Sequence, residues 1–532
     1  MDIAATVANL AWFAANGPGF RRYIHSLRHP RRAQCALLQG YLRGNEDTAL
    51  GRRLDFSRIR TFEDFQSRVP LSLYEDYEKD IERIMAGEAR VLTTEPVLRL
   101  QPSSGSTRAA KLLPYTAGFQ REIRRALAPW MIGLASAHPG VIGGPAYWSV
   151  TPASFSVSHQ SSRIPIGFES DQDYLGGVFG ALVARTLVPC DDLSRLDDIP
   201  RFRMLTLLRL LRTRELRLIS VWHPAFLSLL LETLEARWGE LLDALSFGTE
   251  DKLTPPSPSR AAELKALPAP DPALIWPKLA LISCWGGGHA GTSLESLKHR
   301  FPGVAVQPKG LLATEAFVTL PFNGLHPLAI CSHLFEFLDD SGVAHAAWDL
   351  RCGEVYSVVI TTAAGLYRYR LQDQVRVNGY VEATPSLEFI GKEDRCSDLF
   401  GEKLSDDFVA GVFNRVFDQL DLNPWFFLLT PELSGDGARY VAHLGLDQPL
   451  PERFDQALEA GLRENPHYEY CVRLGQLKPA ATARVAPGAA ERYLAQLGAA
   501  GQRMGDIKPS VLCPLGAPGS NAFIGDTERP SS

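Results

Sequence analysis

Apolar residues recur at helical spacing through the first ninety positions of the chain. Segments 24–27 and 36–42 alternate apolar with basic or polar residues, and segment 62–65 follows Thr61, a residue type that often begins helices. These patterns predict a largely helical N-terminal region. The basic run at 28–32 could bind an anion, but we interpret it as an exposed turn between helices and assign it no function.

From about residue 95 to residue 360 the pattern changes to short β-rich runs that alternate with helical stretches. Such runs lie at 97–100, 218–221 and 279–283, and a helical stretch lies at 225–237. Alternation of this kind predicts an α/β fold in which strands are buried between helices.

Two further changes in pattern concern domain organisation. Region 248–272 is rich in Pro, Ser and Ala, and we interpret it as a surface excursion of the first domain. After residue 393 the elements become shorter and more polar, which is typical of a smaller second domain. We therefore expect a large N-terminal domain over 1–393, a small α+β C-terminal domain over 394–515 and a disordered tail over 516–532.

Length and charge support a multidomain globular protein. The chain has 532 residues, which is too many for one compact core. Hydrophobic residues make up 45% of it, enough to form the cores of two or more domains. Its 55 basic and 60 acidic residues give a net charge of −5. Such a balance offers no overall attraction to nucleic acid or to an anionic membrane, so we expect neither as a partner.

The cysteines and the apolar segments bear on the compartment. Eight cysteines are scattered without a Cys-x-x-Cys pair or a Cys/His spacing typical of zinc sites. The N-terminus carries Asp2 where a signal peptide would be basic, and charged residues interrupt the apolar region 205–230. We expect a soluble, cytoplasmic, monomeric protein with reduced thiols.

One stretch is rich in hydroxyl groups and indicates a phosphate loop. Small and hydroxyl-bearing residues precede Lys111, namely Ser103, Ser104, Gly105, Ser106 and Thr107. Hydroxyl donors and an unhindered backbone suit a polyphosphate, although the spacing does not fit a Walker loop. An ordinary surface turn capped by serines is the alternative interpretation.

A second candidate site follows the apolar run that ends at residue 283. Gly286, Gly287 and Gly288 would let the backbone approach a ligand closely, although a tight turn explains them equally well. We interpret the neighbouring Cys284 and His289 as structural. The apolar, glycine-containing stretch 147–182 and the surroundings of Trp285 are where we expect the apolar part of a ligand to bind.

The third candidate is segment 365–377, which reads Gly-Leu-Tyr-Arg-Tyr-Arg and continues to Asp373. A carboxylate at a strand end can accept hydrogen bonds from both hydroxyls of a ribose. Asp373 is the candidate for this role, with Tyr369 beside it. The alternative is a cross-strand ladder of Tyr and Arg in which Asp373 pairs with an arginine.

Taken together, these motifs resemble the acyl-acid amido synthetases of auxin and jasmonate conjugation, the Gretchen Hagen family, and indicate a bacterial-type member. The family belongs to the adenylate-forming superfamily of acyl-CoA synthetases, luciferases and adenylation domains. The Ser-Ser-Gly loop, a Thr-Glu pair at 314–315 and the Gly-Leu-Tyr-Arg-Tyr-Arg segment occur in the family's order. The resemblance spans about residues 60–515.

The resemblance implies roles for residues that the pattern alone does not assign. Thr314 would lie near the phosphate or the acyl carboxylate, and Glu315 would bind Mg²⁺. Lys508, on a loop of a mobile C-terminal domain, would be the adenylation lysine. Gly391 and Asp394 match the hinge on which that domain rotates.

Four further residues are candidates for contact with the nucleotide. They are Gly287, Gly288, Arg395 and Lys403. Lys403 and Glu402 stand where the family has a lysine and an acidic residue, and a structural salt bridge there is equally compatible with the sequence.

The implied activity is ATP- and Mg²⁺-dependent adenylation of a small carboxylic acid, followed by transfer of the acyl group to an amine or amino acid. Two alternative functions are also compatible with the sequence. An acyl-CoA ligase shares the first step, and a catalytically silent nucleotide-binding relative is conceivable because Arg108 replaces a usual glycine and Leu311 a usual aromatic residue.

Overall fold

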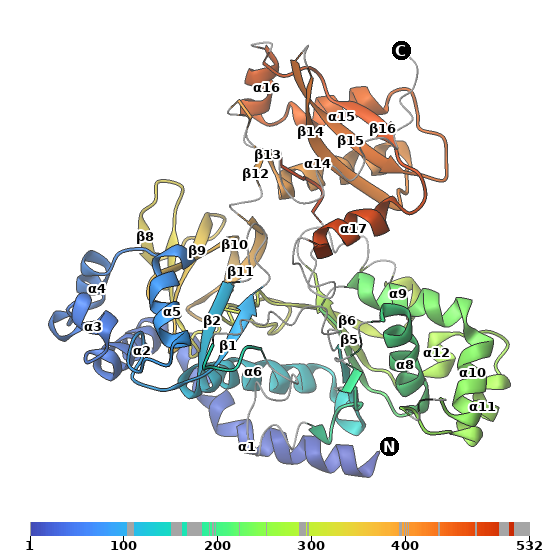
Figure 1. Cartoon of the computed structure of the whole chain (residues 1–532), viewed down its shortest axis with the longest axis horizontal. Helices are drawn as coiled ribbons and strands as arrows, with labels where there is room; N and C mark the ends of the chain where they lie inside the picture. The colour runs from blue at the N-terminus through green and yellow to red at the C-terminus, as the bar shows by residue number, and fades with distance from the viewer. Residues whose placement is uncertain are drawn as a thin grey trace. The chain divides into compact units, whose positions relative to one another are not determined.

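The helices predicted near the N-terminus are present in the computed structural model of the chain (Figure 1). Helix α1 (Ile3–Arg28) ends just before His29, and α2 (Pro30–Asn45) begins with a proline in its first turn, where no backbone N–H is needed. Helix α4 (Phe62–Arg68) begins after Thr61. The Thr61 side chain accepts from the Asp64 amide and the Asp64 side chain accepts from the Thr61 amide, so the predicted helix start is confirmed.

The structure describes most of the chain. The described residues are 2–103, 111–149, 162–167, 184–190, 192–193, 196, 198–222, 224–249, 251, 253–286, 294, 297–392, 396–397, 399–400, 402, 404–434, 437–473, 476–499 and 510–514. By its internal contacts the chain divides into two units. The first comprises Met1–Ser103, Ala110–Leu371 and Val375–Glu388, and the second Ser104–Ala109, Gln372–Gln374 and Phe389–Ser532.

A four-stranded parallel sheet forms one part of the first unit. Its strands, in sheet order, are β3 (Ala146–Trp148), β4 (Leu218–Ser220), β5 (Leu281–Trp285) and β6 (Ala305–Lys309). Five helices gather beside β5 and β6 in Figure 1, and each contributes apolar residues to one buried core cluster: α8 (Ile199–Arg212), α9 (Pro224–Ala236), α10 (Trp238–Phe247), α11 (Pro258–Lys265) and α12 (Pro272–Ile275). The predicted α/β arrangement is confirmed.

The interpretation of region 248–272 as a surface excursion is wrong for α11. Ala261 and Leu264 of this helix are 1% and 0% exposed and belong to the core. Arg260 is also buried, because its guanidinium donates to the carbonyls of Leu211 (2.9 Å) and Ile275 (2.6 Å). An arginine that satisfies buried carbonyls looks, in the sequence, like a surface residue.

A second sheet contains five strands, most of whose residues belong to the first unit. In sheet order they are β11 (Thr384–Lys392), β10 (Tyr369–Val381), β9 (Val355–Thr361), β7 (Leu334–Leu338) and β8 (Ala344–Ala346). A separate antiparallel hairpin joins β1 (Val97–Ser103) to β2 (Lys111–Thr116). Helix α6 (Ala117–Ala137) follows the hairpin and runs beside α1 (Figure 1).

The second unit has its own core. Strands β14 (Phe426–Ser434) and β15 (Gly437–Gly445) pair antiparallel, and β16 (Ala481–Arg484) pairs parallel to β15. The other elements are β12 (Cys396–Ser397), β13 (Leu404–Ser405), α14 (Asp406–Leu420), α15 (Phe454–Leu462), α16 (Pro466–Arg473) and α17 (Ala489–Ala499). Within the described residues, no helix combines the length and the apolar content needed to cross a membrane.

Candidate functional site

The β1–β2 hairpin holds the ends of the predicted phosphate loop. Ser103 and Lys111 are direct partners in the antiparallel register, so the segment between them leaves and re-enters the hairpin at one place. The side chains of this loop, Ser104, Gly105, Ser106 and Thr107, lie outside the described residues.

Lys111 lies beside a tyrosine of the helical N-terminal region. Its Nζ is 5.8 Å from the centre of the Tyr74 ring, and the Leu112 amide donates to the Tyr74 hydroxyl at 2.8 Å. The tyrosine therefore fixes the start of β2 and offers the lysine an aromatic face. This contact orients the cation at the mouth of the loop.

Thr314 and Glu315 form the tip of a tight turn after β6. The backbones of Ala313 and Ala316 bond to each other on either side of the pair, with N–O distances of 2.9 and 3.3 Å. The Leu311 amide donates to the Thr319 hydroxyl (2.8 Å). Both turn residues are partly exposed, so their side chains are available to a ligand.

Gly310 gives this turn its path. A Cβ built on Gly310 would lie 2.4 Å from the carbonyl oxygen of Thr319, closer than two such atoms can approach. The chain therefore needs a glycine directly after β6 to bring the Thr314–Glu315 tip back along its own strand.

Tyr369 connects the turn to the strand of the third motif. It begins β10 and is 2% exposed. Burial raises the pKa of its phenol well above the usual value, and the negative charges of Glu315 and Glu75 raise it further. Glu315, Tyr369, Tyr74 and Lys111 therefore share one electrostatic neighbourhood, although they come from four distant parts of the sequence.

Arg368 of the third motif has a structural role. Arg368 is buried, with its guanidinium bonded to Glu336 (3.1 and 3.2 Å) and to the carbonyls of Gln66 and Val69 (both 2.7 Å). This arginine is therefore structural, and its described carboxylate partner is Glu336. The alternative of a Tyr and Arg ladder in which Asp373 pairs with an arginine stays a prediction.

Asp373 lies in β10 and is 3% exposed. Tyr369, Leu371, Asp373 and Val375 are all buried and alternate with more exposed positions. By its contacts Asp373 groups with the second unit, whereas Tyr369 and Glu315 group with the first. Its predicted role toward a ribose stays a prediction.

Lys309 is a candidate functional residue that the sequence analysis did not identify. It ends β6 at the carboxyl edge of the parallel sheet, where ligands of open α/β sheets bind. Its Nζ donates to the Ser220 hydroxyl (2.7 Å) and the Ser283 carbonyl (3.3 Å), and lies 5.5 and 5.7 Å from the ring centres of Trp130 and Trp222. Burial lowers the pKa of the Lys309 ammonium to about 7. The sequence carries no clear signal for this role, because Lys309 is buried at the end of a strand whose other residues are partly or fully exposed.

The same edge contains part of the region expected to bind an acyl group. Trp285 ends β5, pairs with Lys309 and donates its amide to the Trp222 carbonyl at 2.7 Å. Trp222 is 43% exposed, so it presents apolar surface at the edge. Gly286 packs tightly, since an added Cβ would lie 2.6 Å from Pro308 Cβ. Gly287, Gly288 and His289 lie outside the described residues.

Cys284 fits its structural interpretation. It is 0% exposed within β5, and burial raises the pKa of its thiol to about 11. The side chain therefore stays protonated at neutral pH and packs as an apolar group.

In the second unit, Glu402 proves to be structural. It is 0% exposed and accepts from the amides of Leu399 and Phe400 (both 2.8 Å) and from the Tyr440 hydroxyl. These three hydrogen bonds satisfy both carboxylate oxygens of Glu402. Lys403 and Arg395 lie outside the described residues.

The predicted adenylation lysine, Lys508, also lies outside the described residues, but the segment that follows it is anchored. The Asp406 carboxylate accepts from the amides of Val511 (2.9 Å) and Leu512 (2.8 Å), and the Leu429 amide donates to the Val511 carbonyl (2.6 Å). The chain is therefore fixed to β14 and the start of α14 three residues after Lys508.

Glu315 is the residue best suited to help bind a metal ion. Among the described residues, no group of three or more His, Cys, Asp or Glu side chains could hold a metal ion by itself. Mg²⁺ usually binds through one or two carboxylates together with substrate phosphates, so a single, partly exposed carboxylate fits this ion.

Comparison with known proteins places these features in a family. The model of the GH3 family N-terminal domain matches residues 20–306, and that of the GH3 family central domain matches residues 327–392. Indole-3-acetic acid-amido synthetase GH3.4 of Arabidopsis thaliana is 24% identical over 406 residues, covering 69% of this chain and 68% of that protein. Jasmonoyl--L-amino acid synthetase JAR4 of Nicotiana attenuata is 23% identical and covers 61% and 63%.

The fold has a solved counterpart. The structure of AtGH3.15 acyl acid amido synthetase in complex with 2,4-DB superposes with a TM-score of 0.83 at 19% identity, covering 96% of both chains. The similarity extends over both units, so the chain has the two-domain fold expected from its motifs.

Proposed function

Because this chain belongs to the GH3 family, as its motifs indicated, we propose that it is an acyl acid amido synthetase that uses ATP and Mg²⁺ to join a small carboxylic acid to an amine. Its relatives are named amido synthetases, which are C–N bond-forming ligases. The observation that carries the proposal is the convergence of Glu315, Tyr369, Tyr74 and Lys111 at the mouth of the loop.

The reaction begins with the poor reactivity of a carboxylate toward amines. One carboxylate oxygen attacks the α-phosphorus of ATP, the bond from that phosphorus to the bridging oxygen breaks, and pyrophosphate leaves. The acyl-adenylate now carries AMP as a good leaving group. A neutral amine attacks the acyl carbon, AMP departs, and the amine loses a proton as the amide forms.

The nucleotide contacts follow from chemistry and position. The hydroxyl-rich loop from Ser103 to Lys111 would donate to the phosphates, and the Lys111 ammonium would balance their charge. Asp373 would accept from the ribose hydroxyls. Thr314, at the turn tip, would donate to a phosphate or to the acid.

Glu315 would hold Mg²⁺ together with the phosphates. The bound ion would neutralise charge on the pyrophosphate that leaves. Glu315 itself stays partly exposed at the tip of a turn whose backbone is fixed on both sides, so its carboxylate is presented without rearrangement of the strand.

The acid would lie at the carboxyl edge of β3–β6, beside Trp222, Trp285 and Lys309. The tryptophan surface suits an aromatic or apolar acyl group, and Lys309, with a pKa of about 7, adds partial positive charge at neutral pH. Lys508, on the loop that precedes the anchored segment 510–514, would offset the charge that develops at the α-phosphate. A preorganised charge of this kind is typically worth about 3 to 4 kcal/mol.

Exchange of labelled pyrophosphate into ATP tests the proposal. Exchange should require a carboxylic acid, because labelled pyrophosphate enters ATP only when it reacts with the acyl-adenylate formed from that acid. Glu315→Gln should suppress it by about 10²-fold or more, whereas Glu354→Gln, at an exposed site of the same unit, should leave it unchanged. Absence of acid-dependent exchange with a broad panel of acids would favour the silent nucleotide-binding relative.

A further inference from the structure

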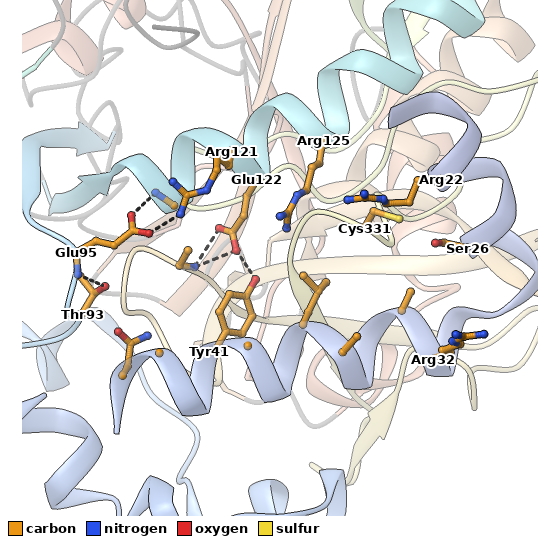
Figure 2. Close-up of a pocket in the computed structure, with 18 of the residues that line it drawn as sticks. Arg22, Ser26, Arg32, Tyr41, Thr93, Glu95, Arg121, Glu122, Arg125 and Cys331 are labelled. Carbon is orange, nitrogen blue, oxygen red and sulfur yellow. Dashed lines mark hydrogen bonds and ion pairs between the residues drawn. The ribbon is translucent and has the colours of Figure 1, made fainter. Parts of the chain in front are cut away.

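A cavity lies between α1, α2 and α6 in the first unit, apart from the candidate site (Figure 2). Its volume is about 590 Å³, within the range of small-molecule sites. Lys111, Glu315 and Tyr369 do not contribute to its walls. The cavity is therefore a separate feature that the proposed reaction does not use.

Arginine side chains dominate the charge of this cavity. Four arginines and two glutamates line it: Arg22, Arg32, Arg121, Arg125, Glu95 and Glu122. Figure 2 shows Arg121 paired with Glu95, which leaves the other three arginines without a carboxylate of the described chain within ion-pair distance. The lining thus carries excess positive charge.

The second glutamate already has its hydrogen-bonding capacity taken up by the protein. Glu122 is 2% exposed and accepts from the Tyr41 hydroxyl, the Ala363 amide (3.0 and 3.1 Å) and His333 Nδ1 (3.1 Å). The Phe317 amide donates to the other nitrogen of His333, so that ring is the neutral tautomer. Glu122 therefore has little capacity left to pair with the arginines.

No further negative charge comes from the thiol in the wall. Burial raises the pKa of Cys331, which keeps its sulfur protonated near neutral pH. Figure 2 shows Arg22 and Arg125 directed toward the same region of the cavity as Cys331. Two guanidinium groups from different helices therefore face a neutral wall.

The open volume is created by small residues on one face of α2. Ala33, Ala36, Gly40 and Gly44 all line the cavity. A Cβ added to Gly40 or Gly44 would meet no atom within 4 Å, so helix packing does not require glycine there. Glycine inside a helix typically costs about 0.5 to 1 kcal/mol relative to alanine, and here it leaves space instead of contact.

We propose that this cavity binds a small oxyanion with two or more negative charges, such as a phosphorylated or polycarboxylic metabolite. Planar guanidinium groups bind phosphate and carboxylate oxygens through paired hydrogen bonds, and Arg22 and Arg125 are directed toward one region of the cavity, where both can contact the same ligand. Ser26, Thr93 and Thr94 add neutral hydroxyls to the lining. The basic run at 28–32, which was assigned no function from the sequence, supplies His29 and Arg32 to this site.

The floor of the cavity, formed by Glu122 and Asn45, is also hydrogen-bonded to the segment that leads to β10. Glu122 binds the Ala363 amide, and the Asn45 side chain donates to the Tyr367 hydroxyl at 2.8 Å. A ligand that orders the arginines above this floor should therefore slow hydrogen exchange at the Ala363 amide.

Calorimetric titration with inorganic phosphate and with citrate tests the proposal. At least one probe should bind the full-length protein, and the double variant Arg22→Gln/Arg125→Gln should weaken that binding about tenfold or more. Arg21→Gln, an exposed arginine of α1 that does not line the cavity, is the matched control and should bind like the wild type. Hydrogen exchange at Ala363 should slow with the bound probe. The stronger of the two probes identifies whether the metabolite is phosphorylated or polycarboxylic.

Lys111→Ala separates this site from the phosphate loop, and it should leave the binding intact. The proposal is wrong if neither probe binds up to about 10 mM, a concentration far above that of a specific metabolite site. It is also wrong if the double variant binds like the wild type, or if Lys111→Ala removes the binding instead.

Discussion

At the scale of single residues, Lys309 makes the free energy of unfolding depend on pH. Its folded-state pKa of about 7 lies below the ordinary value of 10.5. Between these values the unfolded chain binds a proton that the folded protein does not, so folding becomes more favourable as pH rises. Below about pH 7 both states are protonated and the dependence ends.

Lys309→Met should remove this dependence. The unfolding free energy of the wild type relative to the variant should rise between about pH 7 and pH 9, by at most about 1.4 kcal/mol per pH unit. Urea unfolding at several pH values measures it. Lys265→Met, at an exposed helix position, should show no such trend. A constant difference between wild type and Lys309→Met would mean that Lys309 titrates like an exposed lysine.

A second residue, Asp373, tests nucleotide recognition. Loss of one partner of a buried hydrogen-bonded pair typically costs about 1 to 3 kcal/mol, so Asp373→Ala should weaken ATP binding about fivefold or more. Equilibrium binding of ATP measures the effect, and Asp340→Ala, in an exposed turn, serves as the control. Unchanged affinity in a folded Asp373→Ala variant would assign this carboxylate to the structure alone.

At the scale of elements, the turn after β6 depends on a glycine. Gly310→Ala would force a Cβ against the Thr319 carbonyl, and overpacking of this kind typically costs about 1 to 3 kcal/mol. We expect lower stability in urea together with slower pyrophosphate exchange, because Thr314 and Glu315 move with the turn. Gly239→Ala, in α10 with nothing within 4 Å of the added Cβ, should be neutral or stabilising. Wild-type behaviour of Gly310→Ala would show that the turn is adaptable.

The elements also show what the sequence can and cannot reveal. The start of α4 was predictable because the Thr61 capping box is a local pattern, and the strands and helices around the parallel sheet follow from local periodicity. Helix α11 was missed because Arg260 satisfies carbonyls that are distant in the sequence. For the same reason the roles of Lys309 and Glu402 could not be read from their neighbours, since each depends on partners brought together by folding.

At the scale of the whole molecule, the two half-reactions should differ in their dependence on Lys508. Lys508→Ala should suppress acyl-adenylate formation by about 10²- to 10³-fold, because the lysine offsets charge only at the α-phosphate. Amide formation from a supplied acyl-adenylate should be spared. Rapid-quench measurement of each step tests this, and equal losses in both steps would argue against a C-terminal domain that moves between them.

The identity of the acceptor is the central claim, and analysis of products by mass tests it most directly. The enzyme would be incubated with ATP, Mg²⁺, an acid that supports pyrophosphate exchange, and either pooled amino acids or coenzyme A. We predict an amide, formed faster as pH rises from about 7 to 9, because an α-amino group with a pKa of roughly 8 must lose its proton to attack. An acyl-CoA product, with no amide from any amine, would contradict the account and identify the chain as an acyl-CoA ligase.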